Sequence, residues 1–212
     1  MSSQDAQAFQ ARFDVSRETM ERLELYHTLL QKWSRGINLV ARSSLDDVWR
    51  RHFADSAQLL DLASRDAKQW LDLGSGAGFP GLVIAILAQQ KRPELSCTLL
   101  DSDARKGEFL RTVIRHAKIG CTVKTVRVET VEPKCYDVVS ARAVAPLTRL
   151  LSLAKPFLGP GSICLFLKGK SAKTELTEAH RTWHTQTEMV PSETHAEASI
   201  LIIKHVRRMS ER

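Results

Sequence analysis

The sequence has no two cysteines in C-x-x-C spacing, the arrangement that many zinc sites and redox motifs use. Its four cysteines stand apart, each in or beside an apolar strand-like run: Cys97, Cys121, Cys135 and Cys164. Cysteine in such surroundings behaves as a small buried hydrophobe. We therefore expect buried free thiols in a reducing compartment, with neither disulfides nor a bound metal.

A long apolar run is also absent. After Gly81 the longest unbroken one covers residues 82–88, far short of the roughly 20 residues that a membrane span needs. Residues 1–12 are polar and lack the apolar centre of a secretory signal. These absences predict a cytoplasmic protein without a membrane partner.

Repeats and low-complexity segments are missing too. A chain of 212 residues can bury a sizeable core, and one domain with a small appendage is its natural organisation. The 31 Lys and Arg exceed the 24 Asp and Glu, which gives a net charge of +7. That balance favours a polyanionic partner, most simply nucleic acid, although a basic surface that only keeps the protein soluble also accounts for it.

The chain is organised around residues 70–87. An apolar run ends at Asp72, breaks into the alternating glycines Gly74, Gly76 and Gly78, and re-enters an apolar segment after Pro80. This pattern predicts a buried strand, a tight loop and a helix with Pro80 at its first position. Glycines allow positive φ and let a ligand approach the backbone, so we expect a nucleotide or a carboxylate at this helix N-terminus.

The glycine pattern alone leaves three interpretations open. Residues 76–81 satisfy the G-x-G-x-x-G of dinucleotide-binding folds, whereas Asp72 followed by Gly74-x-Gly76-x-Gly78 is the pattern of S-adenosylmethionine (SAM) methyltransferases. A strand-to-helix turn with no ligand is the third interpretation.

Before this loop the sequence predicts a helical cap over residues 1–68. Residues 1–14 are expected to be disordered or weakly helical, Ser16 to cap a helix that stops at Gly36, and Ser44 to begin a second helix. His52 and Asp55 stand among apolar positions of that second helix. They form either a hydrogen-bonded or surface-edge pair or part of the mouth of the ligand site.

After the loop, residues 69–212 predict a Rossmann-like core of the α/β class. Strands are expected at 95–101, 122–129, 136–140 and 162–167, with helices at 104–117, 147–157 and 173–183. Segments 187–190 and 198–206 predict a terminal antiparallel hairpin. Seven strands with the last one antiparallel favour the SAM methyltransferase sheet over a dinucleotide fold, which more often ends with a sixth parallel strand.

Two acids follow neighbouring strands at the predicted ligand edge. Asp101 lies 25 residues after Gly76, near the usual distance for a carboxylate that accepts hydrogen bonds from a ribose, although a plain helix cap is the alternative. Val128 and Glu129 end the next strand, and an apolar residue beside an acceptor suits an adenine.

Several motifs, in order along the chain, resemble one family. They are Asn38-Leu39, Arg51-His52-Phe53-Ala54-Asp55-Ser56, the loop from Asp72 to Gly81, Leu99-Leu100-Asp101-Ser102, Arg127-Val128-Glu129, Ser140-Ala141-Arg142-Ala143 and Leu167-Lys168-Gly169-Lys170. Together they resemble the bacterial small-subunit ribosomal RNA methyltransferase G family, also called glucose-inhibited division protein B, over residues 16–206. The resemblance implies a class I fold that uses SAM to methylate N7 of one guanine in 16S rRNA.

The resemblance also implies the site. By it the cofactor-binding residues are Gly74, Gly76, Gly78, Phe79, Val128 and Glu129, with Asp101 at the ribose by position and Arg142 at the reaction edge of the pocket. Guanine N7 carries a lone pair and no proton, so the transfer needs no general base and catalysis is mostly alignment. Arg142 and Lys168 are then the catalytic candidates, through contacts with phosphate or with O6 of guanine.

Other acceptors lack their characteristic groups. The sequence has neither a Pro-Cys pair for attack on a pyrimidine nor an Asn/Asp-Pro-Pro-aromatic loop for methylating an amino group. Basic residues for RNA are available, although solvated helix faces explain at least half of them: Arg50, Arg51, Arg105, Lys106, Arg111, Lys168, Lys170, Arg207 and Arg208. Without a large RNA-binding appendage, recognition is expected to need a folded RNA or a small-subunit particle. An NAD-binding oxidoreductase and a non-catalytic RNA-binding protein are the alternative functions, and the oligomeric state is not predicted.

Overall fold

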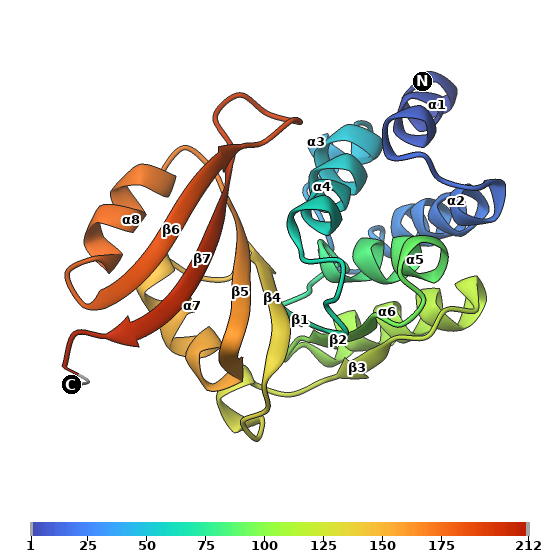
Figure 1. Cartoon of the computed structure of the whole chain (residues 1–212). Helices are drawn as coiled ribbons and strands as arrows, with labels where there is room; N and C mark the ends of the chain where they lie inside the picture. The colour runs from blue at the N-terminus through green and yellow to red at the C-terminus, as the bar shows by residue number, and fades with distance from the viewer. Residues whose placement is uncertain (1, 211–212) are drawn as a thin grey trace.

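The computed structural model describes residues 2–210, and within them a seven-stranded sheet is covered by helices on both faces (Figure 1). The strands are β1 (Gln69–Leu73), β2 (Ser96–Leu100), β3 (Thr122–Lys124), β4 (Tyr136–Arg142), β5 (Leu158–Lys168), β6 (Trp183–Pro191) and β7 (Ser199–Arg208). The α-helices are α1 (Ser2–Phe13), α2 (Arg17–Trp33), α3 (Arg42–Leu45), α4 (Asp55–Leu62), α5 (Gly81–Lys91), α6 (Ala104–Ala117), α7 (Leu147–Ala154) and α8 (Ala172–Ala179). A π-helix, η1 (Trp49–Ala54), and two 3₁₀ turns, η2 (Val128–Thr130) and η3 (Lys155–Phe157), complete them.

The strand order is β3-β2-β1-β4-β5-β7-β6. Strands β1 to β5 pair in parallel, whereas β7 runs antiparallel to both β5 and β6. The predicted seven strands and the antiparallel last strand are therefore confirmed. Because parallel strands end at the same edge, this order brings the residues after β1, β2 and β4 together.

Alternation along the strands divides the core into two layers. Trp70, Val138 and Leu165 point toward α2, α4, α5 and α6, whereas their neighbours Val139 and Phe166 point toward α7 and α8. Figure 1 shows these two groups of helices on opposite sides of the sheet. Helix α5 packs against α2, α4 and the sheet, which explains why its residues 81–88 are buried without exception.

The N-terminal helices differ in part from the prediction. Residues 2–13 form α1, whose Phe9 and Phe13 are buried and whose Phe9 ring lies 5.5 Å from that of Trp49. Of the two expectations for residues 1–14, disordered or weakly helical, the helix is the one found, because Phe9 packs on Trp49 of η1 and Phe13 packs on Phe9. Ser16 caps α2 as predicted and accepts from the Thr19 N–H. Ser44 does not begin the second helix: it lies inside α3 and donates to the Ala41 carbonyl.

Strand β3 is shorter than predicted. It ends at Lys124, and residues 128–130 form the 3₁₀ turn η2. The reason is its neighbour: β3 is an edge strand, and its only partner β2 ends at Leu100, opposite Lys124. Helix α5 begins at Gly81 with Pro80 as the preceding cap, one position later than predicted. Helix α8 ends at Ala179, because Trp183 begins β6 and is buried in the core.

The cap and the core share one hydrophobic cluster, to which α2, α4, α5 and α6 all contribute. The boundary between residues 68 and 69 stays a prediction. Residues 1, 211 and 212 lie outside the described residues. Cys97 and Cys164 are buried free thiols, but Cys135 is exposed just before β4, so burial of all four is wrong. Within residues 2–210 no helix is long and apolar enough to cross a membrane, and no cluster of three potential metal ligands occurs.

Candidate active site

The glycine loop, residues 74–80, follows β1 and is held by hydrogen bonds from two sides. Gly74, Gly76 and Gly78 have φ of +61°, +58° and +102°, a region that costs other L-residues about 1–2 kcal/mol each. The Ser75 N–H donates to the Leu100 carbonyl at 2.8 Å. The buried Tyr26 hydroxyl, from α2, donates to the carbonyl of Ala77. The loop is thus fixed against β2 and the cap before any ligand binds.

Asp101 meets this loop directly. One of its carboxylate oxygens accepts from the Gly76 N–H at 2.7 Å, and the other accepts from the Asp103 N–H at 2.9 Å. The structure therefore brings together Gly76 and Asp101, which the sequence placed at one edge. Each carboxylate oxygen can accept a second hydrogen bond, so acceptor capacity for a ribose is left.

Asp72 is a buried carboxylate beneath the loop that the predicted site omitted. Its Oδ1 accepts from the Ser140 hydroxyl at 2.6 Å, and Ser140 in turn accepts from the Trp70 indole N–H at 2.8 Å. Its Oδ2 has no hydrogen-bond partner among the described residues. Burial raises the pKa of Asp72 to about 6, against the lowering effect of the Ser140 hydrogen bond. The sequence signal for this buried carboxylate was an acid near the end of an apolar strand-like run.

Arg142, at the end of β4, points to the cap face of the sheet, as its register partner Leu167 does. Its guanidinium donates to the Arg51 carbonyl at 3.3 Å, pairs with Asp55 at 3.4 Å and lies 4.8 Å from the centre of the Phe79 ring. Burial lowers the pKa of Arg142, and the carboxylate of Asp55 opposes that shift. Arginine is effectively always protonated in proteins, so the side chain is a cation at neutral pH.

Lys168, one residue beyond Leu167 on β5, points to the opposite face. Its ammonium donates to the Ala145 carbonyl and to Glu175 on α8, both at 2.8 Å, and only 8% of its side chain is exposed. Glu175 also accepts from the Leu147 N–H at 2.8 Å. In this structure Lys168 therefore supports the loop after β4, and its contact with RNA stays a prediction.

Val128 and Glu129 lie in η2 beyond the end of β3. Val128 is half-buried against the second core layer, and the exposed Glu129 pairs with Arg149 of α7 at 3.4 Å. Neither makes a hydrogen bond or ion pair to the glycine loop within residues 2–210. Because this ion pair is at the surface, it is weak and Glu129 can exchange partners readily.

His52 and Phe79 pack face to face, with ring centres 4.8 Å apart. His52 Nε2 lies 2.9 Å from the Ser44 hydroxyl, which itself donates to a carbonyl, so we assign the imidazole hydrogen to Nε2. Burial, together with the positive charges of Arg142 and Arg51, lowers the pKa of His52 to about 3. His52 is therefore neutral at physiological pH, and it shares no hydrogen bond with Asp55 among the described contacts.

A cavity of about 410 Å³ lies beside the glycine loop, at the carboxyl ends of β4 and β5. Asp55, Arg142, Val144, Lys168 and Ala198 are among the residues that line it. Val144 forms the wall toward the glycine loop: a Cβ added to Gly74 would lie 2.7 Å from Val144 Cγ2. Asp55 thus lies at the mouth of a cavity, which was one of its two predicted positions. Arg142, which contacts Phe79, and Val144, which lies beside Gly74, both line this cavity, so they stand between it and the glycine loop.

Comparison with known proteins identifies the family to which this chain belongs. The rRNA small subunit methyltransferase G family matches residues 19–202. This chain belongs to that family. Ribosomal RNA small subunit methyltransferase G of Rhodospirillum centenum is 52% identical over 198 residues, which are 93% of this chain and 89% of the relative. The protein of the same name from Parvibaculum lavamentivorans is 48% identical over 202 residues, 94% of this chain and 89% of the relative.

Solved structures agree on the fold. A putative O-methyltransferase from Klebsiella pneumoniae superposes with a TM-score of 0.58 at 15% identity and covers 95% of this chain and 96% of its own. An MtNAS variant solved in complex with SAM also gives 0.58, at 14% identity, over 93% of this chain and 82% of its own. At such identity the likeness shows the fold alone.

The predictions of the family, the class I methyltransferase fold and a SAM-dependent enzyme are confirmed by these matches. The residues present also fit SAM. A Cβ added to Gly76 would meet no atom closer than the Gly74 carbonyl oxygen at 3.8 Å, so open space adjoins that backbone, and Asp101 keeps acceptor capacity at the same edge.

Proposed function

We propose that this member of the rRNA small subunit methyltransferase G family methylates N7 of a guanine in 16S rRNA. The observation that carries the proposal is that the glycine loop, with Asp101 at its edge, adjoins a cavity of about 410 Å³. Methyl transfer needs two ligands side by side and in line, and alignment of reactants is worth up to roughly 7–11 kcal/mol. The protein supplies that alignment on rigid strand ends.

SAM supplies an electrophilic methyl group when bound. Its expected contacts are Gly74, Gly76, Gly78, Phe79, Asp101, Val128, Glu129 and Arg142. Phe79 is 3% exposed and its ring is covered by Tyr26 and His52, so its share of the contact is through the backbone. Asp101 is already oriented by the Gly76 N–H, which favours one direction for its remaining lone pairs.

The acceptor guanine takes the cavity beyond Arg142. Guanine N7 has no proton to remove, so the reaction needs no general base. His52, which is neutral, is therefore not required for proton transfer. Arginine binds the O6 edge of guanine well, and Arg142 both contacts Phe79 of the glycine loop and lines the cavity. Lys168 acts indirectly: it donates to the Ala145 carbonyl, and its partner Glu175 accepts from the first turn of α7.

The RNA reaches this edge past basic side chains of the cap. Arg50 and Arg51 of η1 are exposed, and the Arg51 carbonyl is already in contact with Arg142. Phosphate contacts from such residues position a nucleic acid without reading its sequence. A folded 16S rRNA or a small-subunit particle in the cytoplasm is the substrate that we propose.

The test is the nucleoside content of the rRNA. Cells of the source organism that lack this gene should lose one 7-methylguanosine from 16S rRNA, measured by mass spectrometry of the digested RNA, and the intact gene should restore it. Complementation with Gly74→Ala or Arg142→Ala should fail. Unchanged 7-methylguanosine in the deletion strain would refute the proposal, and restoration by Arg142→Ala would remove Arg142 from the site.

A further inference from the structure

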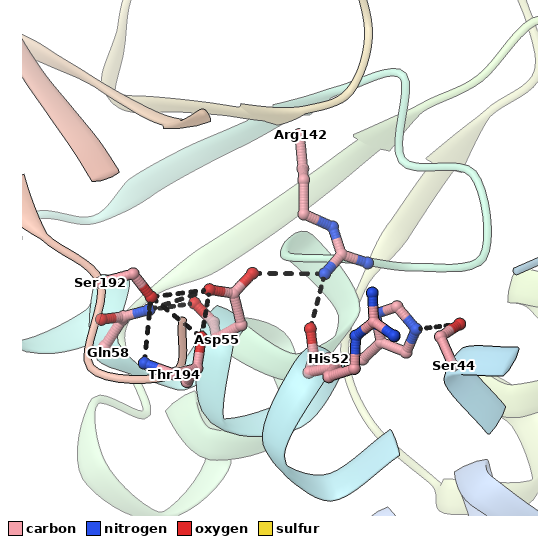
Figure 2. Close-up of polar contacts among 8 residues, drawn as sticks. Ser44, His52, Asp55, Gln58, Arg142, Ser192 and Thr194 are labelled. Carbon is pink, nitrogen blue, oxygen red and sulfur yellow. Dashed lines mark hydrogen bonds and ion pairs between the residues drawn. The ribbon is translucent and has the colours of Figure 1, made fainter. Parts of the chain in front are cut away.

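Asp55, the first residue of α4, connects Arg142 to the loop between β6 and β7 (Figure 2). Its Oδ2 faces the Arg142 guanidinium at 3.4 Å. Its Oδ1 accepts from the Thr194 hydroxyl at 2.9 Å, the Ser192 hydroxyl at 3.1 Å and the Gln58 amide at 3.2 Å. With three donors on one oxygen, the other oxygen is turned toward Arg142.

The environment of this ion pair makes its geometry matter. The Asp55 side chain is 13% exposed and that of Arg142 is 19% exposed, so water replaces their contact poorly. A charge in such a place is unfavourable unless its partner is correctly placed. The ion pair with Asp55 is the single ion pair of Arg142 within the part of the chain that the structure describes. A carbonyl and an aromatic ring are its other contacts.

The loop that orients Asp55 is itself attached to the cap. The Glu193 N–H donates to Gln58 Oε1 at 3.1 Å, and the Glu193 carboxylate pairs with Arg12 of α1. In Figure 1 this loop extends from the β6–β7 hairpin toward α3 and α4. The hydroxyls of Ser192 and Thr194 therefore have fixed positions, and they do not need to be ordered when a ligand arrives.

We propose that Asp55 is a positioning residue for Arg142. Its carboxylate, oriented by Ser192 and Thr194, holds the guanidinium at the wall between the glycine loop and the cavity. This inference rests on the proposed function, because it takes Arg142 to contact the methyl donor and the acceptor. Asp55 acts through Arg142, because its Oδ1 accepts three hydrogen bonds and its Oδ2 is turned toward the guanidinium.

A double-mutant cycle tests this relation. The variants are Asp55→Asn, Arg142→Ala and the two combined, with SAM affinity measured by calorimetry and kcat and KM measured on small-subunit particles. Asp55→Asn keeps the shape and removes the charge, so we expect on the order of a tenfold loss in kcat/KM and a severalfold weaker SAM affinity. In the Arg142→Ala background, where methyl transfer should be lost, the same substitution should change SAM affinity by no more than about twofold.

Three further variants separate positioning from structure. Asp55→Glu should recover part of the loss, because the charge returns. Ser192→Ala combined with Thr194→Val leaves the carboxylate in place but frees its orientation, and should lower kcat/KM with little change in thermal midpoint. Glu21→Gln removes an exposed ion pair with Arg17 on α2 and is the matched control that should behave as the parent protein.

The outcomes are distinct. Wild-type kinetics in Asp55→Asn, or equal losses with and without Arg142, would overturn the positioning role. If the parent protein transfers no methyl group to 16S rRNA, the proposed function is overturned. The double-mutant cycle measured by SAM affinity would still test whether Asp55 acts through Arg142. If Asp55→Asn fails to fold, the Ser192 and Thr194 double variant decides: wild-type kinetics there would overturn the inference.

Discussion

The buried carboxylate of Asp72 should make the stability of this protein fall as the pH rises through 6. Replacing it by asparagine keeps an oxygen for the Ser140 hydroxyl and removes the charge. The side chain is fully buried, its Oδ2 lacks a partner among the described residues, and its pKa is raised from 3.8 to about 6. Burial is the main cause of that shift, because the apolar surroundings disfavour the ionised form.

The sign and size follow from the linkage of protonation to folding. A group whose pKa is higher in the folded state stabilises the fold fully below its unfolded pKa, and this stability is lost as the pH rises through the folded pKa. The rise of the Asp72 pKa from 3.8 to about 6 corresponds to a free energy of about 3 kcal/mol in total. Between pH 4.5 and 7.5, about 2 kcal/mol of it should be lost.

Urea unfolding at several pH values measures this directly. Asp72→Asn lacks the titration, so the stability of the variant minus that of the parent should become more favourable by about 2 kcal/mol from pH 4.5 to 7.5. Subtracting the two proteins removes the contributions of all other titrating groups. A difference that stays constant over this range would refute the raised pKa, and one that falls would reverse its sign.

Three further substitutions have expected outcomes. Gly74→Ala places a side chain at φ +61° against a close neighbour and should weaken SAM binding more than tenfold in calorimetry, with about 1–2 kcal/mol lost in urea unfolding. Tyr26→Phe leaves the Ala77 carbonyl without its donor and should lower the free energy of unfolding by about 1–3 kcal/mol; no change would show that the hydroxyl is dispensable. Lys168→Ala leaves Glu175 without its cation, so the thermal midpoint should fall while SAM affinity stays within about twofold; a large loss of SAM affinity with an unchanged midpoint would contradict the supporting role.

Much of the fold could be predicted because the local and the global patterns agree. The apolar strands, the glycine loop and the Ser16 cap each follow from a few neighbouring residues, and parallel strands must share their carboxyl edge. The failures occur where a partner far away in the sequence decides. Strand β3 stops because β2 stops, and α1 is ordered because Phe9 packs against Trp49 and Phe13 packs against Phe9.

The site shows the same division. Asp101 and Gly76 were placed together correctly by spacing. The ion pair of Arg142 and Asp55 joins residues 87 positions apart on different layers, and no local pattern contains it. The sequence could have predicted that Lys168 points away from the cap face of the sheet, since Leu167 and Lys168 are consecutive on one strand and must point to opposite sides.

The central claim is that this protein moves a methyl group from SAM to N7 of a guanine in 16S rRNA. The most direct measurement incubates the purified protein with methyl-labelled SAM and with small-subunit particles from the deletion strain, and then identifies the labelled nucleoside. We predict label in 7-methylguanosine alone, at a single position. Label in any other nucleoside, or none at saturating SAM, would contradict it.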